Sequence, residues 1–153
     1  MKTFFRLCAL LLLAYPAGDA RAICNVTATS VSFGSYDVFA AAPLDSTGSV
    51  TVSCDYVVAR NVTVSIGASP TSGGFNPRRM NPPTGSDRLD YNLFTTSSRS
   101  TIWGDGTAGT STVLLSSVRR NQPRVTTIYG RVPAGQDIQV GSYTDTVTVT
   151  IFY

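Results

Sequence analysis

The sequence contains no histidine and no glutamate, and its one lysine is Lys2. Histidine is the commonest general base and metal ligand, so its absence removes the usual means of proton transfer at neutral pH. Serine and threonine are plentiful, but no activating partner for a nucleophile is visible. Asp87 and Asp90 are the two carboxylates closest to each other along residues 23–153. Such a pair is more typical of a solvated loop edge than of the active site of a hydrolase. We therefore expect no enzyme, no cofactor and no bound metal.

Long apolar runs are also scarce, and the only one lies at the N-terminus. A short basic segment, residues 1–6, precedes the eight apolar residues 7–14, and an Ala-x-Ala site follows at residues 20–22. Eight residues are too few to span a bilayer, which takes about 20. The pattern predicts a cleaved signal peptide over residues 1–22 and an exported domain over residues 23–153, with no membrane insertion after cleavage.

Cysteine is limited to Cys8, inside the apolar run, and the pair Cys24 and Cys54. In an exported protein an even pair predicts a disulfide. It would close a loop of about 30 residues and contribute roughly 3–4 kcal/mol on the chain-entropy model. A zinc site needs a cluster of cysteine and histidine ligands, and both of these thiols would already be engaged in the disulfide.

Charge is sparse once the signal peptide is set aside. Nine arginines then face eight aspartates, a net charge of +1. This balance gives no reason to expect a nucleic-acid partner. The arginine doublets, Arg78-Arg79 and Arg119-Arg120, are more typical of ion pairs with aspartates than of a phosphate site.

The remaining pattern is alternation with a period of two, which is typical of strands with one buried face. It is clearest over residues 50–54, 62–66 and 146–153, and weaker over residues 29–33, 89–94, 112–118 and 125–132. One long connection, residues 67–88, holds four prolines and four glycines. Short strands separated by turns predict an all-β, immunoglobulin-like β-sandwich, in which the disulfide joins the first strand to the second.

Eight sequence blocks occur in a fixed order within residues 23–153. They are Cys24 with residues 31–37 (VSFGSYD), 43–48 (PLDSTG), 50–54 (VTVSC), 78–80 (RRM), 89–94 (LDYNLF), 103–107 (WGDGT), 129–136 (YGRVPAGQ) and 141–149 (GSYTDTVTV). In this order they resemble the spore coat protein U domain, which is shared with the Csu-type subunits of archaic chaperone–usher pili. The resemblance covers essentially all of residues 23–153.

The resemblance implies a pilin-like sandwich that lacks one strand, so that a groove in its core stays open. A periplasmic chaperone fills such a groove first, and the N-terminal extension of the next subunit then replaces it. The implied partners are that chaperone, an outer-membrane usher and other pilus subunits. By analogy, the last strand would border the groove with the apolar row Val147, Val149, Ile151 and Tyr153. An ordinary core strand in a complete fold is the alternative interpretation of this row.

The sequence departs from the polymerising members of the family, which carry a donor segment before the first cysteine of the domain. Cleavage after Ala22 would leave only Ile23 before Cys24, and cleavage after Ala20 would leave only residues 21–23, whereas a typical strand has about five or six residues. We therefore expect a tip or terminal subunit that accepts a strand and lends none, on a surface fibre serving attachment and biofilm formation.

Two other interpretations stay open. The same fold could serve as a self-contained structural protein of a spore coat or cell envelope. Alternatively, Trp103 and Asp105 could form a surface contact loop of a carbohydrate-binding module. A lone tryptophan beside an Asp-Gly turn is otherwise typical of a loop anchor buried on one face. One carboxylate there is a poor calcium site.

Overall fold

The computed structural model describes residues 23–153, so the signal peptide predicted over residues 1–22 lies outside the described residues. The described chain consists of strands, turns and loops, and none of it forms a helix that could cross a membrane. The strands are β1 (Cys24–Thr29), β2 (Leu44–Cys54), β3 (Arg60–Ile66), β4 (Arg78–Met80), β5 (Leu89–Phe94), β6 (Val113–Val118), β7 (Arg124–Val132) and β8 (Val149–Phe152).

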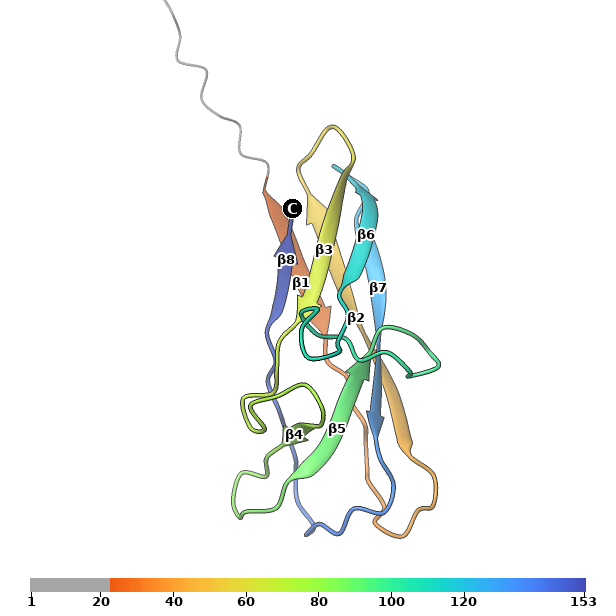
Figure 1. Cartoon of the computed structure of the whole chain (residues 1–153), viewed down its shortest axis with the longest axis vertical. Coiled ribbons are helices and arrows are strands. Elements are labelled where there is room, and N and C mark those ends of the chain that lie inside the picture. Colours follow the sequence, from red (N-terminus) through yellow and green to blue (C-terminus); the bar gives the residue numbers. More distant parts are fainter. Residues whose placement is uncertain (1–22) are drawn as a thin grey trace, which may run out of the picture.

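The strands form two sheets that share one hydrophobic core (Figure 1). The larger sheet has the order β1-β2-β7-β5-β4, and the smaller one has the order β6-β3-β8. All the strand pairs are antiparallel. This architecture confirms the predicted all-β sandwich.

The core follows directly from the alternation in β2 and β3. Val50 and Val52 of β2 and Val62, Val64 and Ile66 of β3 are all 0% exposed. Successive side chains of a strand point to opposite faces, so these residues form apolar rows on the inner faces of the two sheets. Burying each of these side chains is worth about 1.5–3 kcal/mol.

The disulfide joins Cys24 of β1 to Cys54 of β2, as the sequence predicts. The two cysteines lie directly opposite each other across the strand pair. The next residues along the two strands, Ile23 and Asp55, form the backbone hydrogen bond instead, since Asp55 N donates to Ile23 O at 3.0 Å. Cys24 and Cys54 therefore occupy a non-hydrogen-bonded pair, where opposing side chains come closest. The bond fastens an edge strand to the sheet.

Arg78 of β4 is fully buried and braces the interior. Its guanidinium donates to Asn92 Oδ1 and Trp103 O, both at 2.8 Å, and to Gly67 O at 2.9 Å. Trp103 Nε1 in turn donates to Val64 O at 3.1 Å. These bonds connect the end of β3 with β4, β5 and the loop after β5. Burial lowers the pKa of Arg78 from its usual value, because desolvation disfavours the charged form.

Two strand predictions differ from the structure, and one strand was missed. Residues 29–33 alternate as a strand would, yet β1 ends at Thr29, and the following residues extend without a ladder. Residues 146–148 likewise alternate but precede β8, which begins at Val149. β4 was not predicted because its three residues lie within the Pro- and Gly-rich connection.

Candidate functional site

One side of the sandwich leaves two strand edges without a partner. β1 is the edge of the larger sheet and β8 is the edge of the smaller one. Figure 1 shows these two strands next to each other, and residues of the two strands are in contact. Within residues 23–153, no other strand pairs with either free edge.

The free edge of β8 can be assigned residue by residue. Gly67 N donates to Thr148 O at 2.8 Å, and Ser65 lies opposite Thr150 in the register with β3. Backbone groups alternate in direction along a strand, so those of Thr148 and Thr150 point toward β3. Those of Val147 and Val149 therefore point away from the sheet, toward β1.

The edge strands on the other side of the sandwich, β4 and β6, have features that discourage the addition of a further strand. There β4 has only three residues, and the pairing of β6 with β3 shifts register between Arg60 and Val62. Short edge strands and bulges are the devices by which proteins prevent unwanted strand pairing. The β1 and β8 edges have an apolar hollow between them instead.

That hollow is a groove with a volume of about 1070 Å³. One wall is residues 28–38, which continue from β1, and the other is residues 138–149, which lead into β8. We call these segments the first wall and the second wall. The floor is made of side chains from four strands, β3, β4, β5 and β7: Ile66, Met80, Leu89, Tyr91, Leu93, Ile128 and Val132.

The first wall lies against the larger sheet because two glycines permit a close approach. A Cβ on Gly130 would lie 2.6 Å from Val31 Cγ1 and 2.8 Å from Phe33 Cζ. A Cβ on Gly48 would lie 2.7 Å from Thr29 O. The wall is also tied to β2, because Ser46 Oγ donates to Ser32 O at 2.5 Å.

The second wall behaves as a strand that has a partner on one side only. Side chains alternate between exposed and partly buried from residue 142 of this wall to residue 152, near the end of β8. Asn81 N donates to Thr144 O at 2.8 Å, and Thr144 N donates to Asn81 O at 2.9 Å. The backbone groups of Tyr143, Asp145 and Val147 make no backbone hydrogen bond to any residue from 23 onward. They form a second unpaired row above the groove.

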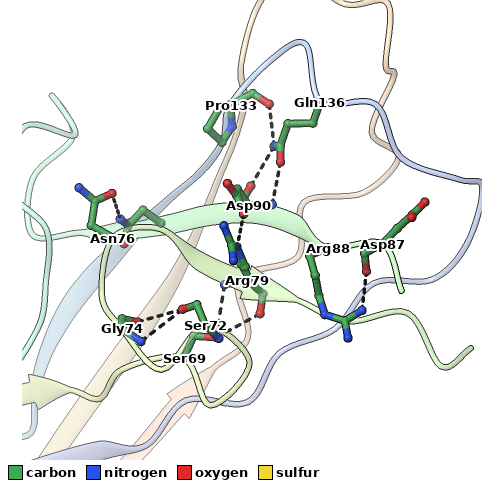
Figure 2. A network of polar contacts seen from close by, with 11 residues as sticks. Ser69, Ser72, Gly74, Asn76, Arg79, Asp87, Arg88, Asp90, Pro133 and Gln136 are labelled. Carbon is green, nitrogen blue, oxygen red and sulfur yellow. Dashed lines mark hydrogen bonds and ion pairs between the residues drawn. The ribbon is translucent and has the colours of Figure 1, made fainter. Parts of the chain in front are cut away.

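The loop that carries the second wall is held by Gln136, as Figure 2 shows. Its side chain accepts from Asp90 N at 2.7 Å and donates to Asp90 O at 3.0 Å, which imitates a strand pair with β5. Gln139 N donates to Asp87 Oδ2 at 2.9 Å. Tyr36 OH donates to Pro133 O at 2.9 Å and so links the first wall to the same loop. Both walls are thus anchored at this end of the groove.

One polar pair interrupts the apolar lining. Tyr91 OH donates to Asp145 Oδ2 at 2.7 Å, and both residues line the groove. The pKa of Tyr91 lies well above its usual value, first because the phenol is buried and then because of the bond to Asp145. Tyr91 therefore stays a neutral hydrogen-bond donor at physiological pH.

The apolar row predicted for the last strand divides into two parts. Val147 and Val149 line the groove. Ile151 is partly buried against the core and lies opposite Val64 of β3. Tyr153 is 57% exposed and makes an edge-to-face contact with Tyr56, with ring centroids 6.1 Å apart. The row thus borders the groove at its first two positions and continues past it.

The surface contact role considered for Trp103 is wrong. Its side chain is 0% exposed, and it lies in the core as a loop anchor. Asp105 is exposed, but its carboxylate accepts from Thr107 N and Thr107 Oγ1 and so closes its own turn. Within residues 23–153 no cluster of three metal-ligating side chains occurs.

The sequence did not reveal the first wall or the floor as parts of the site. Alternation at Val31 and Phe33 indicated a strand, but not one that leaves its sheet to border a groove. Met80, Leu89 and Tyr91 come from separate strands, and only the topology brings them together.

The chain matches one family model and is similar to several known proteins. The model of the Spore Coat Protein U domain matches residues 17–150. Protein U of Myxococcus xanthus is 33% identical over 132 residues, which cover 81% of this chain and 72% of that protein.

Two of the similar solved structures come from pili. One is the CsuC-CsuE chaperone–tip adhesion subunit pre-assembly complex from the archaic chaperone-usher Csu pili of Acinetobacter baumannii. It matches with 24% identity and a TM-score of 0.56 over 86% of this chain and 40% of that chain. The other is HdaB, the minor tip subunit of the E. coli Hda pilus, with 13% identity and a TM-score of 0.44 over 83% of this chain and 79% of that one. The likeness to the Csu complex is one of fold.

Proposed function

The chain belongs to the spore coat protein U domain family, and from this membership and the open groove we propose that it is a non-catalytic structural subunit of a chaperone–usher surface fibre. In this proposal the groove accepts a β-strand from a partner protein. The observation that carries the proposal is that an apolar groove lies beside strand edges whose backbone N–H and C=O groups have no partner among the described residues.

The backbone rows distinguish a strand from a small ligand as the occupant. A volume of about 1070 Å³ is near the upper end of the range for small-molecule pockets, about 300–1,000 Å³, so size alone does not decide. A small ligand needs only a few convergent polar groups. An added strand uses a continuous row of N–H and C=O groups for affinity and pockets for alternate side chains for specificity.

The energetics favour an occupied groove. At about 3.3 Å per residue, the stretch from residue 142 to residue 149 matches a strand of about eight residues. About four of its side chains would point inward, and burying four apolar ones is worth roughly 6–12 kcal/mol before the cost of ordering the strand. An empty groove would leave this apolar surface in water and invite aggregation.

The occupants proposed are a periplasmic chaperone first and a strand from another subunit afterwards. An outer-membrane usher would mediate the exchange, so that the protein passes from the periplasm to the cell surface. The Csu complex of Acinetobacter baumannii pairs a chaperone with a tip adhesion subunit of this fold, which supports a chaperone as the first partner.

The place in the fibre that we propose is the tip or another terminal position, in a fibre that serves attachment and biofilm formation. This part depends on the predicted cleavage after Ala22, which would leave Ile23 alone before the disulfide at Cys24. N-terminal sequencing of the protein exported by its own host tests it. A mature N-terminus at residue 23 supports the terminal position, and an N-terminal extension long enough to form a strand contradicts it.

The strand-acceptor role is tested by producing the full chain with export to a bacterial periplasm, with and without a chaperone of the chaperone–usher class. We expect a 1:1 complex and a higher soluble yield with the chaperone. Val149→Asp, which puts a charge in the groove, should abolish the complex. Val57→Asp is the matched control, since Val57 is 79% exposed and outside the groove. A monomer equally stable without the chaperone contradicts the proposal.

A coat or envelope role is the second candidate, and the match to the Spore Coat Protein U domain model favours it. In that case the groove would be filled by another copy or another coat protein. Fractionation of the native host decides between the two. Recovery in sheared surface fibres supports the first, and recovery in a spore or envelope fraction supports the second.

A further inference from the structure

Asp145 is the one carboxylate in the inward row of the second wall. It lies between Tyr143 and Val147, both of which are partly buried against the core. Its Oδ2 accepts from Tyr91 OH at 2.7 Å, and its Oδ1 accepts from Thr146 N at 2.9 Å. Among the described residues, no arginine comes within 4.0 Å of this carboxylate. A negative group thus stands in an apolar groove without a cation in contact.

Arg78 is a buried arginine whose charge acts on Asp145, but its hydrogen bonds go to other groups. Its guanidinium donates to Asn92 Oδ1 and to the carbonyls of Trp103 and Gly67, all of them neutral acceptors. Arg78 therefore acts on Asp145 through space only. Its side chain is fully buried in this network and does not turn toward the groove without breaking these bonds.

A strand that fills the groove removes the water around Asp145. Burying a carboxylate without a cation costs several kcal/mol, while a close pair with good hydrogen bonds offsets most of that cost. We propose that Asp145 is a specificity-determining residue, which selects an incoming strand with Lys or Arg at the inward position that faces it. The proposal rests on the strand-acceptor function above.

The neighbours of Asp145 fix the rest of the motif. Inward positions of a strand are two residues apart. The inward residues of the incoming strand on either side of its Lys or Arg would therefore face Tyr143 and Val147. Both should be apolar, which gives the pattern apolar-x-basic-x-apolar. A slip by one residue would turn the apolar side chains outward, and a slip by two would put the cation against an apolar wall. The carboxylate would thereby set the register of the incoming strand.

The test uses the full chain, exported and purified, and a set of dye-labelled peptides of about eleven residues. Each peptide alternates Val and Thr, and its central inward residue is Lys, Arg, Ala or Asp. Fluorescence anisotropy gives the Kd of each. We expect the Lys and Arg peptides to bind at least about tenfold more tightly than the Ala peptide, and the Asp peptide to bind weakest. Equal affinities for all four overturn the inference and leave the strand-acceptor function standing. Absence of binding by every peptide overturns both.

Two variants separate selection from a structural role. Asp145→Asn should remove the preference for Lys and Arg while the Ala peptide still binds. Tyr91→Phe removes the hydrogen bond but keeps the carboxylate, so the preference should persist even where stability falls. The control is Asp105→Asn, an exposed aspartate outside the groove, which should leave all four Kd values unchanged. A preference that survives Asp145→Asn contradicts the proposal.

Discussion

Val31 of the first wall lies directly over Gly130 of β7, so closely that a Cβ on Gly130 would come within 2.6 Å of Val31 Cγ1. Phe33 covers the same glycine from the next inward position. Beyond Thr29 the first wall follows the larger sheet without forming strand pairs with it, and Val31 and Phe33 contact it at Gly130. Bulk at this point would lift the wall and change the shape of the groove.

Gly130→Ala should therefore destabilise the protein by about 1–3 kcal/mol, the usual cost of adding a carbon to a packed site. It should also weaken strand binding, because Val31 and Phe33 would shift. Urea unfolding and peptide anisotropy measure the two effects. Gly74→Ala is the matched control, since a Cβ there would meet nothing within 4 Å, and it should stay within about 0.5 kcal/mol of wild type. Equal stabilities of the two variants would refute the packing argument.

Arg78 and Arg79 are adjacent in β4 and should respond very differently to replacement by methionine. Arg78 is fully buried, and its loss leaves two backbone carbonyls without this donor and removes one of the two donors to Asn92 Oδ1, the other being Leu93 N. Each buried acceptor left without a donor costs about 1–3 kcal/mol, so we expect Arg78→Met to lower the free energy of unfolding by about 2–6 kcal/mol. Arg79 pairs with Asp90 at 2.8 Å on the surface, so Arg79→Met should cost at most about 1 kcal/mol. Similar losses in urea unfolding would mean that the buried network is unimportant.

The disulfide should account for a large part of the stability. Cys24 and Cys54 are 30 residues apart, and closing such a loop is worth roughly 3–4 kcal/mol through the entropy of the unfolded chain. Unfolding in urea with and without a thiol reductant measures the difference. A double Cys24→Ala, Cys54→Ala variant should match the reduced protein. If reduction leaves the midpoint unchanged, the disulfide has no thermodynamic role.

Asp45 should make stability depend on pH in the acid range. Arg131 donates to both of its oxygens, at 2.7 and 2.8 Å, and these bonds, with the charges of Arg99 and Arg131, hold the pKa of Asp45 below its usual value. Because the folded pKa is the lower one, the stabilisation is complete above the unfolded value and is lost as pH falls through the folded value. The pair is partly exposed, so the effect is at most about 1 kcal/mol.

The measurement is the unfolding free energy of wild type and Asp45→Asn between pH 6 and pH 2. We expect wild type to be the more stable at pH 6, with the difference vanishing at the acid end. Asp55→Asn serves as control, because Asp55 and Arg120 are exposed and 3.6 Å apart. A difference in unfolding free energy that stays constant from pH 6 to pH 2 would show that the Asp45–Arg131 pair does not stabilise the protein electrostatically.

The sequence predicted those strands whose alternation coincides with a ladder. Residues 89–94 were predicted as a strand and match the extent of β5, since β4 pairs with its first half and β7 with its second half. The stretch over residues 146–148 alternates equally well, but it lacks a partner on the groove side and is not part of β8. Alternation reports which face is buried, and it does not report whether a neighbouring strand exists.

The candidate site was predictable only in part, because most of it is assembled by tertiary contacts. Val147 and Val149 could be placed beside a groove from the family resemblance and their period. The floor could not, since its side chains come from strands far apart in the sequence. Trp103 misled because the Asp-Gly turn after it suggests exposure, whereas the indole packs inward and bonds to Val64 O. Arg78 gave no sign of burial, as an arginine doublet usually lies in solvent.

The most direct test of the account is amide hydrogen exchange of the full chain with and without a bound strand peptide. The amides of Val147 and Val149 point away from β3 and should become strongly protected on binding, because the incoming strand supplies their acceptors. The amide of Thr150, which faces β3, should change little. Peptide binding that leaves Val147 and Val149 exchanging as fast as before would contradict the claim that the groove completes its sheet with a partner's strand.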